Sequence, residues 1–215
     1  MDPTLHVARF DAWAPVYEAS ALQEAFYTRL HRKVLGLASA AGPAPGRIVD
    51  IGCGTGRLLR AAAVVYPDAG LVGVDISAGM LAQARAMAQA QAQAMAAPGE
   101  RTAFVRADCA ALPFGDAGFD LATCTASSHH WPEPAVALAE LRRVLAPDGL
   151  LVLAHLQGVA PWDPPAAGHI RRRGVRISSG LAVPLFDSGF RVCDAALFAE
   201  CPLMPATVVL CARRR

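Results

Sequence analysis

Three glycines at alternating positions, Gly52, Gly54 and Gly56, directly follow the short run Ile48–Ile51. Glycine lets the backbone turn tightly and lets a ligand approach where a Cβ atom would collide. Open α/β sheets bind cofactors at such turns, at the carboxyl ends of their strands. The dinucleotide fingerprint Gly-x-Gly-x-x-Gly would need glycine where this chain has Arg57. The run therefore predicts a crevice for a nucleotide-like small molecule, the alternative being a turn that binds nothing.

Two aspartates follow further predicted strands downstream of the glycines. Asp75 ends the run Leu71–Asp75, about 20 residues after the glycines, where a carboxylate can accept two hydrogen bonds from a ribose diol. The alternative role for Asp75 is a helix-terminal charge near Ser77. Asp108 follows the next strand, where a side-chain acceptor beside a backbone amide could bind an adenine edge. The alternative role for Asp108 is to stabilise a turn.

Histidines and arginines supply further candidate chemistry. The run Ser128–Trp131 follows the fourth predicted strand and contains His129 and His130. Either histidine could act as a base near neutral pH, although loop histidines are often simply solvated. His155 ends the fifth strand, where a hydrogen bond in the core or a loop is the more ordinary role. The basic run Arg171–Arg173 indicates solvated surface, with binding of an anionic acceptor as the alternative.

The composition limits the classes of protein to which this chain can belong. Its 215 residues suit one domain, and with 54% hydrophobic and 18% charged residues the chain is expected to fold compactly. A net charge of +2 indicates neither nucleic acid nor a membrane surface as partner. The first residues lack the basic and apolar regions that would predict a signal peptide, and no apolar run reaches the roughly 18 residues that would predict a membrane span. The six cysteines form no Cys-x-x-Cys pair, which predicts reduced thiols in a cytoplasmic protein and no metal site.

The elements that would position these residues alternate between strand and helix. The predicted strands are Arg47–Ile51, Leu71–Asp75, Ala103–Arg106, Phe119–Thr125 and Leu150–Leu156. The predicted helices between them are Arg57–Tyr66, Met80–Ala97 and Ala135–Leu145. We expect Ser77 to cap the second of these helices, Pro134 to begin the third, and Pro147 with Gly149 to end it. This alternation predicts an α/β fold with a parallel sheet that is covered on both faces.

The two ends of the chain have other patterns. Leu5–Leu37 is helical and amphipathic, and Pro15 is expected to break it; the loop Gly42–Gly46 follows. After Gln157, prolines and glycines indicate irregular structure up to Gly180. The strands Phe190–Phe198 and Thr207–Ala212, with a turn around Pro202, then predict an antiparallel hairpin at the edge of the sheet.

Taken in order, these motifs resemble the class I S-adenosylmethionine-dependent methyltransferases. The resemblance is strongest to the small-molecule group that includes the ubiquinone and menaquinone C-methyltransferases. It extends over roughly Phe10 to Leu156, and an ordered set of motifs is more specific than any one of them. Asp148 departs from the pattern, because the family usually has glycine there. The matching segments are Val49–Gly56, Val72–Ser77, Asp108–Phe114, Phe119–Leu121 and Leu141–Gly149.

The resemblance implies a Rossmann-like, doubly wound sheet of seven strands, mostly parallel, with an antiparallel C-terminal edge hairpin. It implies a single domain in three parts: an N-terminal helical lid at 1–42, a cofactor-binding core at 46–156, and a substrate-side insertion with the terminal hairpin at 157–215. Asp50 and the backbone around Gly52 would hold the methionine ammonium group of S-adenosylmethionine, and Asp75 would hold the ribose hydroxyls. The full implied set of cofactor contacts is Tyr17, Asp50, Gly52, Cys53, Gly54, Gly56, Asp75, Ile76, Asp108, Cys109, Thr125 and Ala126.

Within that set, Ile76 would pack on the adenine, and Asp108 with Cys109 would contact its edge. Thr125 and Ala126 would line the methionine side. Tyr17 would close over the cofactor, although Trp13 and Tyr17 lie four residues apart and equally fit an apolar stripe for helix docking.

The implied activity is in-line methyl transfer to a small-molecule acceptor, with His129 or His130 as base if the acceptor must lose a proton. An NAD-dependent dehydrogenase is one alternative, against which Arg57 and the segment Asp108–Phe114 argue. A non-catalytic, S-adenosylmethionine-binding regulatory partner is the other. The sequence lacks a basic stripe with interleaved aromatic residues, which disfavours a nucleic-acid substrate. A homodimer is compatible with the sequence.

Overall fold

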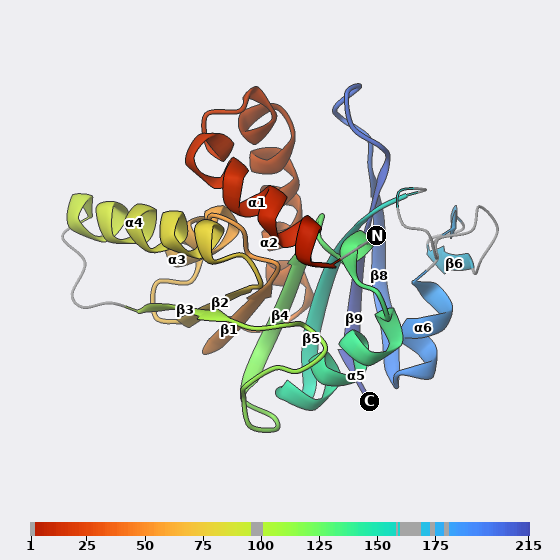
Figure 1. Cartoon of the computed structure of the whole chain (residues 1–215). Helices are drawn as coiled ribbons and strands as arrows, with labels where there is room; N and C mark the ends of the chain where they lie inside the picture. The colour runs from red at the N-terminus through yellow and green to blue at the C-terminus, as the bar shows by residue number, and fades with distance from the viewer. Residues whose placement is uncertain (1–2, 96–100, 158, 160–168, 173–174, 179–180) are drawn as a thin grey trace.

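A mixed, seven-stranded sheet runs through the described part of the chain, with the strand order β3-β2-β1-β4-β5-β9-β8 (Figure 1). The computed structural model describes residues 3–95, 101–157, 159, 169–172, 175–178 and 181–215. Strands β1 to β5 are parallel, and β9 lies antiparallel between β5 and β8. The strands are β1 (Arg47–Ile51), β2 (Gly70–Asp75), β3 (Thr102–Arg106), β4 (Phe119–Thr125), β5 (Leu145–Leu156), β8 (Phe190–Phe198) and β9 (Thr207–Arg214). The predicted doubly wound fold with a C-terminal antiparallel hairpin is confirmed.

Helices cover both faces of this sheet. Successive strand residues point to opposite faces, so Ile48 belongs to one apolar core and Val49 to the other. The first core is closed by α2 (Arg29–Ala41) and α3 (Arg57–Val65), and the second by α5 (Pro134–Val144) and α6 (Ala182–Asp187). Because the strand order reverses between β1 and β4, these two strands form the switch point at which such sheets bind ligands.

Local signals mark the starts of two helices correctly. The Ser77 hydroxyl accepts a hydrogen bond from the Met80 amide at 3.1 Å, so Ser77 caps α4 (Ala78–Ala94) as predicted. The end of α4 predicted at Ala97 lies outside the described residues. Pro134 occupies the first turn of α5, also as predicted. Pro147 and Gly149 do not end this helix directly, because it stops at Val144 and they lie within β5.

The chain turns sharply between α5 and the buried part of β5. Pro147 disfavours helical geometry at Ala146, so α5 cannot continue through this turn. Asp148, the departure from the family pattern, has the left-handed φ of 59°. Glycine adopts this conformation without strain, which accounts for the family preference at this position.

The N-terminal segment corrects one prediction. Pro15 does not break the helix where expected, since α1 (Pro3–Tyr17) continues through it. A proline removes one backbone donor, and α1 ends two residues later. A short turn leads to the π-helical η1 (Gln23–Thr28), which continues into α2.

The segment after β5 contains more regular structure than predicted. A two-stranded antiparallel ribbon pairs β6 (His169–Arg172) with β7 (Val175–Ser178). The prolines that indicated irregular structure here, Pro161, Pro164 and Pro165, lie outside the described residues. In the part of the chain that the structure covers, no helix combines the length and the apolar character that crossing a membrane requires.

Candidate functional site

The glycine-rich turn after β1 has a backbone that favours glycine at three positions. Gly52, Gly54 and Gly56 have φ values of 67°, 54° and 74°, in the left-handed region that other residues rarely adopt. A Cβ atom at Gly52 would also collide with the side chain of Ser127, and one at Gly56 would lie 3.0 Å from the ring of Phe104. The turn therefore brings its backbone close to the ends of β1 and β4.

Asp75 ends β2 and holds this turn in place. Its two carboxylate oxygens accept hydrogen bonds from the Gly54 amide at 2.8 Å and from the Ser77 amide at 2.9 Å. Burial raises the pKa of Asp75 above its usual value. Each oxygen retains a further lone pair, so the carboxylate can still accept hydrogen bonds from a ligand. The side chain of Ile76, which follows, is 42% exposed beside it.

Asp50 is a buried carboxylate at the end of β1. Its Oδ1 accepts a hydrogen bond from the Thr123 hydroxyl at 2.7 Å, and the side chain is almost fully buried. Burial, and then the charge of Asp75, raise the pKa of Asp50 to about 7. Among the described residues, no arginine or lysine forms an ion pair with Asp50. A cationic ligand group would therefore stabilise its charged form.

Cys53 and the segment after β3 flank these acids. The Cys53 side chain belongs to the core beneath the turn, so its backbone is the part that a ligand could reach. The Ala107 amide donates to the Asp75 carbonyl at 3.2 Å, which brings this segment beside β2. Asp108 is exposed, and its carboxylate accepts from the Ala110 amide at 2.9 Å, as in the alternative turn role. Cys109 is half-buried.

The end of β4 faces the glycine turn. Ala126 has a left-handed φ of 48°, and its amide donates to the Ala154 carbonyl at 2.9 Å. The Thr125 hydroxyl is buried and has no hydrogen-bond partner within the described structure. Ser127 bonds to the Ile51 carbonyl at 3.1 Å and so joins β4 to β1. The unpaired Thr125 hydroxyl leaves a polar atom available to a ligand.

The histidine pair follows on the short helix η2 (Ser128–His130). Ser128 and His155 are both fully buried, and Ser128 Oγ lies 3.1 Å from His155 Nδ1. This buried contact fixes η2 to the end of β5. The rings of His129 and His130 lie 3.8 Å apart between centroids, and His130 meets the ring of Phe10 from α1 at 5.5 Å. No three His, Cys, Asp or Glu side chains gather as a metal site within the ranges that the structure describes.

Helix α1 crosses this edge of the sheet (Figure 1). The Asp11 carboxylate accepts from the Ser77 hydroxyl at 2.6 Å and from the Gly79 amide at 2.8 Å, which fixes α1 to the start of α4. Tyr17 packs edge-on against Trp13, with 4.7 Å between ring centroids, and lies 6.1 Å from Tyr27. Burial raises the pKa of the Tyr17 phenol. Tyr17 thus lies in an aromatic cluster, as the helix-docking alternative expects, and its contact with a cofactor stays a prediction.

Glu18 joins the end of α1 to the glycine turn. It accepts a hydrogen bond from Thr55, and forms ion pairs with Arg57 at 3.1 Å and with Arg60 at 3.0 Å. Burial alone would raise the pKa of Glu18, but the Thr55 hydrogen bond and the two arginines together lower it. The carboxylate is therefore charged at neutral pH and holds α1 against α3.

Sequence reasoning missed Thr123, Glu18 and Asp11. The pairing of β1 with β4 places Thr123 directly opposite Asp50, and this register follows from the order of the strands in the sheet, which the predicted strand ranges do not contain. Glu18 and Asp11 had no local signal, because their partners lie 37 and 66 residues away along the chain.

Comparison with known proteins gives a consistent result. Residues 49–153 match the family described as "Methyltransferase domain". Malonyl-[acyl-carrier protein] O-methyltransferase of Geobacter sulfurreducens is 38% identical over 147 residues, which are 68% of this chain and 48% of that protein. Demethylmenaquinone methyltransferase of Thermus thermophilus is 38% identical over 125 residues, which are 58% of this chain and 51% of that protein. The chain thus spans about half the length of these relatives.

The fold has solved counterparts. The Burkholderia thailandensis 1,6-didemethyltoxoflavin-N1-methyltransferase, with bound 1,6-didemethyltoxoflavin and S-adenosylhomocysteine, superposes with a TM-score of 0.69 at 21% identity, covering 98% of this chain and 88% of that one. This likeness shows the shared fold. Together with the matched domain, the sequence relatives and the glycine turn flanked by Asp50 and Asp75, it leads to one conclusion: the chain belongs to the class I S-adenosylmethionine-dependent methyltransferases, whose cofactor is S-adenosylmethionine.

Proposed function

We propose that this chain transfers the methyl group of S-adenosylmethionine to a small-molecule acceptor. The observation that carries the proposal is the pair of carboxylates, buried Asp50 and half-buried Asp75, on either side of a turn whose three glycines all have left-handed φ values. When bound, the cofactor supplies an electrophilic methyl group on a positively charged sulfur. The protein then needs no covalent nucleophile and has to bind, orient and exclude water.

The residues around the turn fit the parts of this cofactor. Asp50, with a pKa of about 7, would become fully charged beside the methionine ammonium group, which the Gly52 backbone would also contact. Asp75 would accept the ribose hydroxyls with its remaining lone pairs. Exposed Ile76 would pack on the adenine, whose edge Asp108 and Cys109 would contact. Thr125 and Ala126 would line the methionine side, where the Thr125 hydroxyl lacks a partner within the described structure.

The N-terminal part would close the site. Contacts of Asp11 with α4 and of Glu18 with the glycine turn support a lid formed by residues 1–42. Holding donor and acceptor in line in a closed site can contribute roughly 7–11 kcal/mol to the lowering of the barrier. If the acceptor must lose a proton, His129 or His130 would take it, and the buried Ser128–His155 contact would hold their turn in place.

The acceptor would bind beside the segment 157–215. The Thermus relative is named for demethylmenaquinone, which supports a small organic molecule as the proposed class, whereas the Geobacter relative is named for a malonyl group on an acyl-carrier protein. We also propose that the acceptor is an anion that would bind near the basic run Arg171–Arg173. The side chains of this run lie outside the described structure. All six cysteines are free thiols, which supports a reducing compartment such as the cytoplasm.

Thermal unfolding with S-adenosylhomocysteine or NAD tests the choice of cofactor. A ligand at 100 times its dissociation constant adds roughly 2.7 kcal/mol of stability, which moves the melting temperature measurably. We expect S-adenosylhomocysteine to stabilise the protein and NAD to have no effect. Stabilisation by NAD alone would overturn the proposal in favour of a dehydrogenase.

A metabolite screen with an isotopically labelled methyl donor tests the transfer itself. We expect one labelled product, whose mass identifies the acceptor. Cofactor binding without any labelled product would favour the second candidate, a regulatory S-adenosylmethionine-binding partner.

A further inference from the structure

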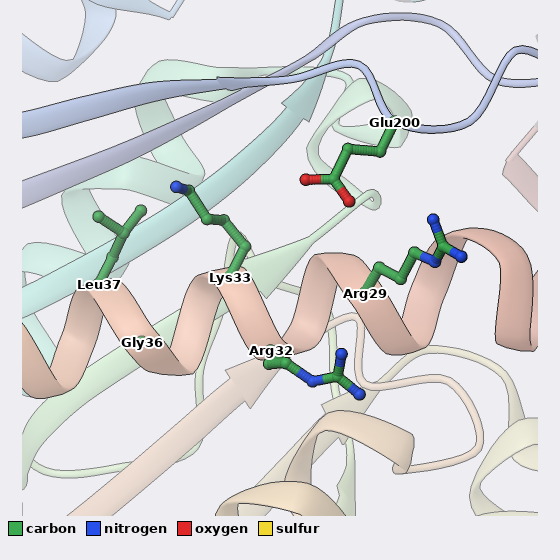
Figure 2. Close-up of a pocket in the computed structure, with 6 residues that line it drawn as sticks. All are labelled: Arg29, Arg32, Lys33, Gly36, Leu37 and Glu200. Atoms are coloured by element: carbon green, nitrogen blue, oxygen red, sulfur yellow. The ribbon is translucent and has the colours of Figure 1, made fainter.

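One face of α2 forms a basic groove outside the cofactor site. Arg29, Arg32, Lys33, Gly36 and Leu37 follow the helical spacing i, i+3, i+4, i+7 and i+8, so they share one side of α2. Glu200, from the connection between β8 and β9, forms the opposite wall. In Figure 2 the Glu200 carboxylate lies across from the helix, between the Lys33 and Arg29 side chains. The groove has a volume of about 610 Å³, within the range of small-molecule sites.

The cations of this groove are available to a ligand. Within the described structure, the side chains of Arg29, Arg32 and Lys33 form no ion pair or hydrogen bond, and all three residues are exposed. The arginines beside the glycine turn differ, because Arg57 and Arg60 both pair with Glu18. Three cations against the single carboxylate of Glu200 give the groove a local excess of positive charge.

Gly36 keeps the floor of the groove open. It lies inside α2, where glycine is a poorer helix former than alanine, and a Cβ atom there would meet nothing within 4 Å. Neither packing nor a left-handed backbone therefore requires glycine at this position. Its effect is to leave space beside half-buried Leu37, which offers apolar surface next to the cations.

We propose that this groove is a second binding site, for a small organic anion with at least two negative charges. Phosphate or carboxylate groups would contact Arg29, Arg32 and Lys33, and the carbon skeleton would lie over Gly36 and Leu37. The groove is concave and Glu200 closes one side of it, which disfavours an extended polyanion such as nucleic acid. The site lies on the outer surface of α2 and is separate from the crevice of Asp50 and Asp75.

The chain offers a selective probe, because Lys33 is its only lysine. Reductive methylation with ¹³C-formaldehyde keeps the positive charge and labels Lys33 and the terminal amino group, whose resonance serves as an internal control. We would titrate the labelled full chain with inorganic pyrophosphate, citrate and poly-L-glutamate at constant ionic strength. We expect a saturable shift of the Lys33 resonance with pyrophosphate or citrate, and no saturable shift of the terminal amino group.

Three groove variants and one control variant test whether the groove itself is responsible. Arg29→Glu should weaken anion binding at least tenfold. Arg191→Glu makes the same charge change at an exposed arginine of β8 and should weaken binding less than twofold. Glu200→Gln should strengthen it severalfold, because it removes a repelling charge. Gly36→Leu fills the floor with a better helix former and should weaken binding without lowering the melting temperature.

The outcomes separate this site from the cofactor site. Binding of S-adenosylhomocysteine should be the same in all of these variants, so a failure of the proposed function would leave the anion result intact. The proposal is overturned if neither small anion gives a saturable Lys33 shift, or if Arg191→Glu weakens binding as much as Arg29→Glu. A response to poly-L-glutamate alone would instead assign the groove to an acidic protein.

Discussion

The crevice at the carboxyl ends of the strands and the groove on α2 both collect charge, but they do so in opposite ways. In the crevice, Asp50 is buried and Asp75 is half-buried, and both carboxylates accept hydrogen bonds from neighbours and have raised pKa values. In the groove, Arg29, Arg32 and Lys33 are exposed and have no partner within the described residues. Buried charges interact strongly because little water screens them, whereas exposed charges are screened by water and salt. Substitutions in the crevice should therefore have larger effects than those in the groove.

The largest effect is expected for Gly52→Ala. The alanine would have to keep the left-handed φ of Gly52, and its Cβ would collide with the Ser127 side chain. Backbone strain and overpacking together should lower the free energy of unfolding by about 3 kcal/mol. Gly54→Ala is the matched control, because its Cβ meets nothing within 4 Å and only the strain of about 1–2 kcal/mol applies. Urea unfolding measures both. Equal losses would mean that contact with Ser127 does not matter.

The next effect concerns the protonation of Asp50. A cationic ligand group stabilises the charged carboxylate, so affinity for S-adenosylhomocysteine should fall about tenfold per pH unit below the Asp50 pKa of about 7. Calorimetry between pH 5.5 and 8 measures this slope. In Asp50→Asn we expect affinity to be at least about tenfold lower at pH 8, with the slope abolished. A slope that persists in the variant would assign the proton to another group.

The raised pKa of Asp50 also determines how the stability of the protein changes with pH. Because the folded protein holds the Asp50 proton more tightly than the unfolded chain, the contribution of Asp50 to stability is present at low pH and is lost as pH rises through about 7. The ligand-free wild type should therefore lose more stability between pH 5 and pH 8 than Asp50→Asn does. Identical pH profiles of urea unfolding would contradict this.

A smaller effect is expected at the contact between α1 and the glycine turn. Glu18→Gln removes the charge that holds Arg57 and Arg60, and should cost about 1–2 kcal/mol of stability, since Glu18 is partly buried. It should also speed cofactor release severalfold, measured by stopped-flow fluorescence. Glu24→Gln is the control, because Glu24 is 80% exposed and 3.7 Å from Arg57, and should cost less than about 0.5 kcal/mol. Equal effects would show that burial does not distinguish these pairs.

The smallest effect, and a gain, is expected in the groove. Gly36→Ala adds a methyl group in open space and should raise the free energy of unfolding by about 0.5–1 kcal/mol through helix propensity. Binding of S-adenosylhomocysteine should not change. A loss of stability in urea unfolding would mean that α2 needs glycine for a reason other than the open groove.

Much of the sheet and of the cofactor crevice could be predicted from local patterns. Apolar runs with short helical segments between them located β1 and β4 within their observed bounds, and the alternating glycines marked the turn that Asp75 now supports. These features depend on neighbours in sequence: side-chain periodicity, helix capping by Ser77 and the backbone freedom of glycine. Pro15 shows the limit, because α1 continues through a residue that usually ends a helix.

Long-range pairings were decided by the tertiary structure alone. Thr123 reaches Asp50 only through the register of β1 with β4, and Glu18 reaches Arg57 and Arg60 only because α1 crosses the end of the sheet. Glu200 and Lys33 line one groove only because the chain folds the hairpin of β8 and β9 against α2, although most of the chain lies between the two residues. Amino-acid sequence thus determined which segments are strands, helices and turns, through short-range geometry. Packing of the helices and strands determined which charges are buried together and which stay exposed, because burial depends on neighbours in space.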